Sequence, residues 1–229
     1  NIKMCGRFQL SVKGKHISER FNVEVFDEKY SPTYNCAPSQ NLPVITNNES
    51  EKLNYFKWGL VPFWSKDPKI GFKLINARSE SIDEKPAFKA AFAQRRCIIP
   101  ANGFYEWKKE GKQKLPYRIV LKNDEIFAIA GIWETWKDAE DRALNSFSII
   151  TTSPNSLMKN IHYRMPVILN KQDEQAWLFE KDEKYLKSLL QPFDALKMEA
   201  YKISAKVNSP INNTSDIIEK YKSEQTSMG

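Results

Sequence analysis

The stretch Met4-Cys5-Gly6-Arg7-Phe8 holds the residue best suited to covalent chemistry, a cysteine close to the start of the chain. If everything through Met4 is removed, Cys5 carries an α-amine and a thiol on neighbouring carbons. Their reference pKa values are about 7.7–8.0 and about 8.5, so both groups are partly deprotonated near neutral pH. Such a 1,2-aminothiol condenses with an aldehyde to an imine, and its thiol then closes a thiazolidine ring. In the intact sequence Asn1-Ile2-Lys3-Met4 blocks the amine, so this chemistry requires their removal.

The other side chains suited to proton transfer or anion binding each have an ordinary structural explanation when taken singly. Glu106 lies in the aromatic stretch Gly103-Phe104-Tyr105-Glu106-Trp107, where a carboxylate is either on the solvent face or buried with a raised pKa. His162 precedes an apolar strand, a common position for a hydrogen-bonded structural histidine. The remaining candidates suit a turn, an ion pair or burial as a small hydrophobe: Asn76, Arg78, Arg164 and Cys5.

Familiar catalytic and cofactor-binding motifs do not occur in the sequence. It has no G-x-G-x-x-G, P-loop, H-E-x-x-H or G-x-S-x-G pattern. With only His16 and His162, and with three widely spaced cysteines, it indicates neither a metal-ligand cluster nor a disulfide framework. We expect no cofactor and no metal.

The segments that must position these side chains are mostly short predicted strands. Alternating or aromatic runs bounded by Gly, Pro and polar residues predict strands at 8–10, 42–46, 53–60, 97–100, 103–107, 117–121, 126–133, 147–152, 165–169 and 198–203. Short helices are predicted at 18–26, around 88–92, and at 155–161, 172–178 and 182–190. Loops are expected at 31–38, 61–73 and 108–114. Consecutive strands with helices at the sides predict an α+β fold, mostly antiparallel, with a strongly curved or barrel-like β core and peripheral helices.

Composition indicates the broad class of protein to which the chain belongs. The chain has 229 residues, 41% of them hydrophobic, which is enough for one domain with a sizeable core. No composition break divides it, so we expect a single domain over residues 5–218. Residues 1–4 would be a leader, a tag or a processed segment, and residues 219–229 a polar tail. No apolar run approaches the roughly 18 residues of a membrane span, which favours a soluble cytoplasmic protein. The net charge of +7 suits a polyanionic partner without requiring one.

Six short motifs in a fixed order change this assessment. They are Met4-Cys5-Gly6-Arg7-Phe8, Asn35-Cys36-Ala37-Pro38, Trp58-Gly59-Leu60-Val61-Pro62, Asn76-Ala77-Arg78-Ser79-Glu80, Gly103-Phe104-Tyr105-Glu106-Trp107 and His162-Tyr163-Arg164-Met165-Pro166. Together they closely resemble the SRAP family (SOS response-associated peptidase), whose members sense abasic sites and crosslink themselves to DNA. Val207-Asn208-Ser209-Pro210 fits the last motif of that family. The resemblance runs from Cys5 to about Ile218.

The resemblance implies a DNA-repair function on single-stranded DNA that contains an abasic site. The N-terminal cysteine of the family traps the aldehyde of the ring-opened sugar as a thiazolidine and shields the lesion. Carried onto this sequence, Cys5 is the crosslinking nucleophile, and Glu106 is the acid/base carboxylate. His162 assists sugar ring opening and crosslink reversal, and Asn76 positions the cysteine and the sugar. Self-removal of the N-terminal residues and strand-cleaving lyase activity are implied as well.

The resemblance also implies which residues contact DNA. Arg7, Arg78 and Arg164 match phosphate contacts, and arginine geometry suits them. Pro38 and Trp107 match positions that pack against DNA beside the lesion, and Thr151 matches a polar contact near the site. Trp58 and Trp64 are suited either to base stacking or to the core, and we expect Trp58 in the core.

Two other functions fit parts of the sequence. A non-catalytic single-strand binding module would keep the fold without the reactive amine. A thiol peptidase acting on other proteins would use Cys5 and His162, although no recognisable substrate subsite accompanies them. The main expectation is a monomer that crosslinks abasic single-stranded DNA after losing residues 1–4, associated with the nucleoid if the protein is bacterial.

Overall fold

Five strands close into a ring in the computed structural model, which describes residues 6–26 and 28–221 of the chain. β4 pairs with β3, β3 with β6, β6 with β9, β9 with β10, and β10 returns to β4. The last pairing is parallel and the others are antiparallel. Ring closure removes the open edges of this sheet. The predicted barrel-like core of an α+β fold is therefore confirmed. The ring strands are β3 (Asn41–Thr46), β4 (Asn54–Trp58), β6 (Arg96–Ala101), β9 (Phe127–Lys137) and β10 (Ala143–Thr152).

Three short strands extend the ring where the candidate residues lie. β5 (Asn76–Arg78) runs parallel to β10, β11 (Met165–Pro166) pairs with β10, and β12 (Ile168–Leu169) pairs with β9. Thr151 of β10 lies opposite both Arg78 of β5 and Pro166 of β11. The predicted single strand over 165–169 is thus two strands that pair with different partners.

A second sheet contains the first and the last strand of the described residues. Its strand order is β13-β8-β7-β1-β2. β7 and β8 form a long hairpin that continues to the pair Glu110 and Gln113, so the loop expected over 108–114 is mostly strand. β2 lies within the expected loop 31–38, because it pairs with β1. The bounds are β1 (Phe8–Leu10), β2 (Thr33–Cys36), β7 (Gly103–Glu110), β8 (Gln113–Leu121) and β13 (Met198–Lys202).

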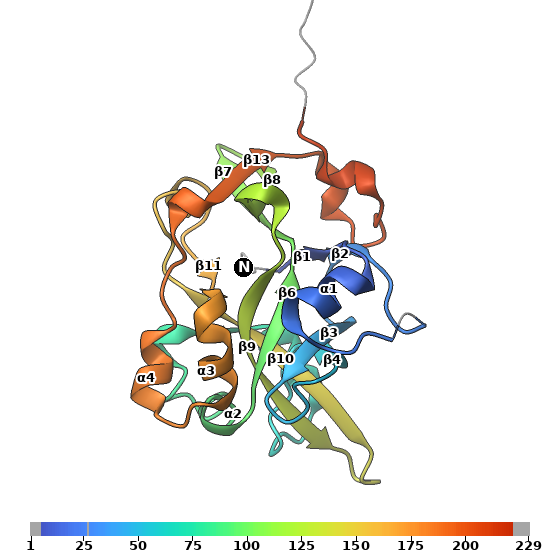
Figure 1. Cartoon of the computed structure of the whole chain (residues 1–229), viewed down its shortest axis with the longest axis vertical. Coiled ribbons are helices and arrows are strands. Elements are labelled where there is room, and N and C mark those ends of the chain that lie inside the picture. The colour runs from blue at the N-terminus through green and yellow to red at the C-terminus, as the bar shows by residue number, and fades with distance from the viewer. Residues whose placement is uncertain (1–5, 27, 222–229) are drawn as a thin grey trace, which may run out of the picture.

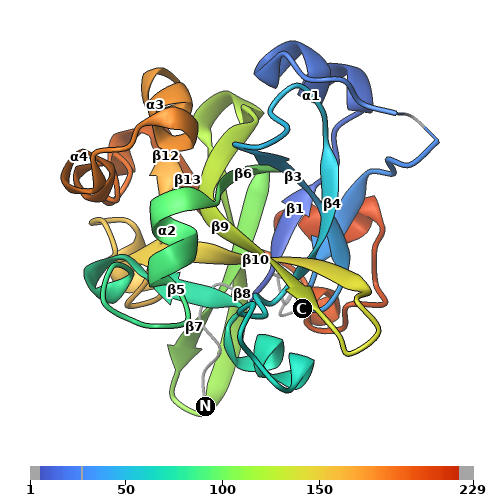
Figure 2. The ribbon, with the colours of Figure 1, turned by 90° about the horizontal axis from the view of Figure 1, so that it is seen from below.

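Short helices cover the outside of the strands. Figures 1 and 2 both show α1 on one side of the molecule and the α3–α4 pair on the other. α1 begins at Gly14 and ends before Asn22, which adopts a left-handed conformation with φ of 53°, so the helix expected at 18–26 starts and stops earlier. The helices are α1 (Gly14–Phe21), α2 (Lys89–Gln94), α3 (Glu174–Phe179) and α4 (Glu183–Ser188).

Trp58 stands at the centre of the aromatic core. Only 1% of its surface is exposed, its ring stacks on Phe147 at 6.1 Å between centroids, and it meets Phe8 at 5.3 Å. Its buried indole N–H donates to the carbonyl of Ile75 at 2.9 Å, which satisfies the one polar atom of the ring. The expectation that Trp58 is a core residue is confirmed, whereas Trp64 is 49% exposed.

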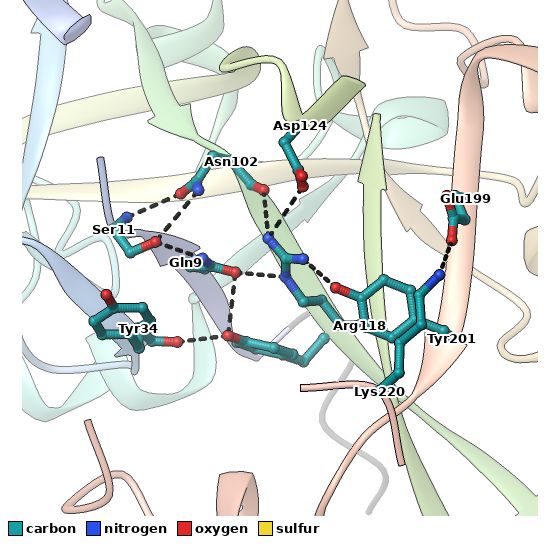
Figure 3. Close-up of polar contacts among 10 residues, drawn as sticks. Gln9, Ser11, Tyr34, Asn102, Arg118, Asp124, Glu199, Tyr201 and Lys220 are labelled. Atoms are coloured by element: carbon teal, nitrogen blue, oxygen red, sulfur yellow. Dashed lines mark hydrogen bonds and ion pairs between the residues drawn. The ribbon is translucent and has the colours of Figure 1, made fainter. Parts of the chain in front are cut away.

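A buried polar network lies within the second sheet (Figure 3). Arg118 of β8 is 5% exposed, and its Nε donates to Gln9 Oε1 of β1 at 2.7 Å. Its terminal nitrogens donate to the hydroxyl of Tyr201 on β13 and to the carbonyl of Asn102. The Tyr105 hydroxyl donates to the carbonyl of Tyr34 at 2.6 Å. The network therefore joins strands from both ends of the chain.

Two glycines allow the loop after β4 to approach that strand closely. Gly59 has φ of 128°, and a Cβ on it would lie 2.6 Å from the carbonyl oxygen of Gly71. A Cβ on Gly71 would equally lie 2.6 Å from the carbonyl oxygen of Gly59. Both contacts are with backbone, so no side-chain rotation relieves them.

Replacing Gly59 by alanine is therefore expected to lower the free energy of unfolding by about 3 kcal/mol, since backbone strain and a backbone clash add together. Gly111 is the matched control, because it also has positive φ (58°) but open space around its Cβ position. Gly111→Ala should cost only about 1 kcal/mol. Urea unfolding of both variants checks this, and equal losses would contradict the role of the close contact.

Candidate active site

The pairing of β1 with β7 carries the start of the chain to Glu106. Phe8 lies opposite Phe104, and the carbonyl of Arg7 accepts from the N–H of Tyr105 at 3.0 Å. Continued by one residue, this register brings Gly6 level with Glu106. Cys5, which directly precedes Gly6, lies outside the described residues. The described strand therefore leads toward the predicted acid/base carboxylate.

Glu106 and His162 form a buried pair of titratable groups. Glu106 is 2% exposed and His162 is 7% exposed, and 3.9 Å separate the Glu106 Oε1 and His162 Nδ1 atoms. Nδ1 of the histidine lies 3.2 Å from both the N–H and the carbonyl oxygen of Arg164. Its Nε2 is buried and has no hydrogen-bond partner within the described part of the chain. Two titratable groups thus lie side by side where bulk water barely reaches them.

This pair opens into a cavity of about 660 Å³. Aromatic, amide and basic side chains surround the two titratable groups. The lining includes Trp107, Tyr163 and Asn208, together with Lys108, Lys109, Lys114 and Lys159. A cavity with a buried acid/base pair, ring faces and basic side chains suits an anionic substrate that carries a flat group.

Arg164 connects the histidine to β10 and to the short turn Ser79–Ser81 that follows β5. The residue is 8% exposed, and its Nη2 donates to Glu80 Oε2 at 2.9 Å and to the Thr151 carbonyl at 2.6 Å. Hydrogen bonds from this guanidinium hold the pKa of the Glu80 carboxyl below its ordinary value. Arg164 and Thr151 therefore meet, as expected for residues of one site, while their contact with DNA remains a prediction.

The segment after β13 supports Arg7 and Trp107. Arg7 Nη1 donates to Asn35 Oδ1 at 2.7 Å and to the carbonyl of Val207 at 2.8 Å. The indole N–H of Trp107 donates to Asn208 Oδ1 at 2.7 Å, and the Arg7 guanidinium lies 5.9 Å from the Trp107 ring centre. Burial lowers the pKa of Arg7, but an arginine remains charged. These contacts hold Arg7, the predicted phosphate contact, beside Trp107, which is predicted to pack against DNA.

The remaining predicted residues lie on neighbouring elements. Asn76 and Arg78 are the first and last residues of β5, opposite Ile149 and Thr151 of β10. Arg78 is exposed. Pro38 is half-buried in the turn between β2 and β3, next to Ser39, which has φ of 74°. Their roles toward a substrate stay predictions.

Residues of the cavity wall were missed by the sequence reasoning. Lys109 and Lys114 lie on the β7–β8 hairpin, and Lys159 lies just before His162. The available signal was the lysine-rich stretch from Lys108 to Lys114, which was interpreted only as a charged loop. Asn208 belonged to a quoted motif, but its bond to Trp107 has no sequence signature.

Two negative findings apply to the described residues alone. They contain no group of three or more His, Cys, Asp or Glu side chains arranged to hold a metal ion. No helix among them is both long enough and apolar enough to cross a membrane.

Comparison with known proteins gives a consistent set of relatives. The family model for SOS response associated peptidase (SRAP) matches residues 4–210. The chain is 50% identical over 224 residues to the Abasic site processing protein YoqW of Bacillus subtilis (strain 168), covering 95% of this chain and 100% of that one. It is 30% identical to the Abasic site processing protein HMCES of Xenopus tropicalis, covering 82% and 65% respectively. A crystal structure of a protein from Bacteroides thetaiotaomicron matches with a TM-score of 0.87 at 34% identity, covering 95% and 100%.

Two of the three cysteines are unsuited to thiol chemistry in the folded protein. Cys36 and Cys97 are both free and 0% exposed. Burial raises the pKa of the Cys36 thiol to about 12 and raises that of Cys97 well above its ordinary value. Both thiols therefore stay protonated near neutral pH, and the thiolate is the reactive form.

Alkylation of the native protein with iodoacetamide at pH 8 should accordingly leave Cys36 and Cys97 unmodified, whereas both should react in urea. The modified positions are identified by peptide mass spectrometry. Cys5→Ala serves as the control, because this variant should take up no label until it is unfolded. Rapid native labelling of Cys36 or Cys97 would contradict this picture of the buried thiols.

Proposed function

Because the chain belongs to the SOS response associated peptidase family, we propose that it processes abasic sites in single-stranded DNA by crosslinking to them through Cys5. The observation that carries the proposal is the buried pair of Glu106 and His162, which opens into a basic, aromatic cavity beside the strand leading to Cys5. The curated relatives named above are abasic site processing proteins. On this proposal the protein acts as a monomer on DNA inside the cell.

The first step opens the deoxyribose ring of the lesion and frees an aldehyde at C1′. Ring opening requires a proton at the ring oxygen and loss of the proton from the C1′ hydroxyl. His162 is suited to deliver the proton to the ring oxygen, because its Nε2 has no other partner among the described residues and its ring lines the cavity. Glu106, whose Oε1 lies 3.9 Å from Nδ1 of His162, is suited to receive the proton from the C1′ hydroxyl.

The second step joins the protein to the sugar. The α-amine of Cys5 attacks C1′, the hydroxyl leaves as water, and an imine remains. The thiol sulfur then bonds to the imine carbon while its proton passes to the nitrogen, which closes the thiazolidine. One water is released and no oxidant or reductant is consumed. Glu106 would carry the protons, since a carboxylate positioned at the reacting atoms can accept a proton and return it.

The imine is the branch point between protection and strand cleavage. Loss of a proton from C2′ of the imine would eject the 3′ phosphate, which is a lyase reaction. Closure of the ring consumes the imine and prevents that loss. We propose Asn76 as the group that orients Cys5 and the sugar so that closure is faster.

The crosslink also requires that residues 1–4 be removed. Hydrolysis of the Met4–Cys5 bond consumes one water, releases Asn1-Ile2-Lys3-Met4 and frees the amine. We propose that the protein performs this cleavage itself, through the same cavity. The phosphates of the bound strand would meet Arg7, Arg78 and Arg164, with Pro38, Trp107 and Thr151 beside the flanking nucleotides.

Protein that starts at Cys5 is expected to form a denaturant-resistant complex with single-stranded DNA carrying one abasic site, visible as a shifted band on a denaturing gel. Cys5→Ala should abolish the band, and Glu106→Gln should slow its formation by about 10²–10⁴-fold, the range for loss of a general acid/base. Glu134→Gln is the matched control, since Glu134 is also a buried carboxylate (5% exposed, against 2% for Glu106) and lies outside the cavity. A band that survives Cys5→Ala would rule out the proposed nucleophile, and binding with no band would favour the non-catalytic module.

The full sequence is expected to lose the mass of residues 1–4 on incubation, as measured by intact-protein mass spectrometry. Glu106→Gln should retain that mass if the cavity performs the cleavage. Crosslinking by protein that still carries all four residues would show that the amine mechanism is wrong.

A further inference from the structure

We propose that Lys109, Lys114 and Lys159 form a phosphate-binding wall that holds the single strand flanking the lesion. The proposal rests on the proposed function for the identity of the strand. None of these three lysines belongs to the motifs that identify the family. All three line the cavity that contains Glu106 and His162, and all three are exposed.

The hairpin brings two of these lysines together at a cost in stability. Lys109 of β7 lies directly opposite Lys114 of β8. Like charges in directly opposed positions of an antiparallel pair repel each other and destabilise the sheet. No ion pair compensates either lysine within residues 6–26 and 28–221. A repulsive pair of this kind is useful if an anion binds between or above the two ammonium groups.

One neighbouring lysine on the same hairpin has its charge compensated by a carboxylate. Lys108 also lines the cavity, but its Nζ lies 2.7 Å from Glu110 Oε1. That pairing raises the pKa of Lys108 and lowers that of Glu110. Because Lys108 already has an anionic partner, we leave it out of the wall.

Lys159 brings a third ammonium group to the cavity from a different element. It lies in the short turn Met158–Asn160, three residues before His162. The buried Nε2 of that histidine has no partner among the described residues, so the cavity holds an unused donor or acceptor as well as the lysines. The hairpin and the turn thus present positive charge to one space that also contains the acid/base pair.

The chemistry of the cavity indicates a sugar-phosphate backbone as its occupant. A volume of about 660 Å³ lies within the range of about 300–1,000 Å³ typical of small-molecule sites, which leaves room for more than one sugar. Trp107 provides a ring face for a neighbouring base, and stacking tolerates any base sequence. Lysines act as flexible point charges, so they suit a backbone whose phosphates vary in position. The wall would therefore contribute affinity without sequence preference.

The test measures binding of fluorescein-labelled, undamaged (dT)15 by anisotropy at several salt concentrations. It compares the wild type with the triple variant Lys109→Gln, Lys114→Gln, Lys159→Gln. Each phosphate contact on a single strand contributes about 0.7 to the slope of log affinity against log salt. Loss of three contacts should reduce that slope by about 2 and weaken binding at least tenfold near 50 mM salt.

The matched control is Lys13→Gln, Lys181→Gln, Lys184→Gln. These three lysines are also exposed, and they lie near α1 and α4 and not in the cavity wall. Both triple variants lower the net charge by the same amount, so only a local effect separates them. The control should keep the slope and the affinity of the wild type.

Three results would overturn the inference: a wall variant with wild-type slope, an equal loss in both triple variants, or no binding of (dT)15 by the wild type. Thermal unfolding adds a second measurement, because removal of the Lys109–Lys114 repulsion should leave the midpoint at or above that of the wild type. A clear fall would indicate a structural role for these lysines. Binding of single-stranded DNA without any crosslink to abasic DNA would count against the proposed function, but it would not contradict the phosphate-binding role of the three lysines.

Discussion

Burial of the Arg118 guanidinium is the constraint on which the second sheet depends. A buried charge is strongly unfavourable unless its N–H groups find acceptors, and Arg118 finds them on β1, on β13 and at Asn102. Gln9 must therefore face Arg118, which fixes the position of β1 against β7. A strand of only three residues would otherwise be weakly anchored. Because β1 is fixed, Arg7 and Gly6 reach Tyr105 and Glu106 in a single register.

The site depends on this arrangement because its parts come from distant segments of the chain. Glu106 and Trp107 lie on β7, His162 and Arg164 lie between β10 and β11, and Asn208 follows β13. Alternation along β7 sends Tyr105 into the small cluster with Val207 and turns Glu106 toward the cavity. One strand therefore contributes a core residue and a functional residue in successive positions.

Sequence patterns predicted the strands that show a local alternation of apolar and polar residues. They did not predict strands that form only by pairing with a segment far away in the sequence. The alternation around Trp58 and the aromatic run 103–107 were sufficient to predict strands and the burial of Trp58. The strand Thr33–Cys36 looked like a loop, because prolines flank it on both sides and its polar residues become a strand only through pairing with β1. The parallel pairing of β10 with β4 and β5 has no local signature. For the site, the motifs predicted Glu106, His162 and Arg164, whose roles stay predictions, whereas the lysines of the hairpin have exposed, polar patterns that resemble any solvated surface.

The hydrogen bonds from Arg7 to the Val207 carbonyl and from Trp107 to Asn208 have a consequence for folding during protein synthesis. Translation proceeds from the N-terminus, so the residues around Cys5 leave the ribosome long before Val207 and Asn208 do. Until then Arg7 lacks its carbonyl partner and the indole of Trp107 lacks its anchor. These contacts of Arg7 and Trp107 therefore cannot form early in synthesis. Two side chains beside the cavity would thus lack these anchors in a nascent chain until nearly the entire domain had been made.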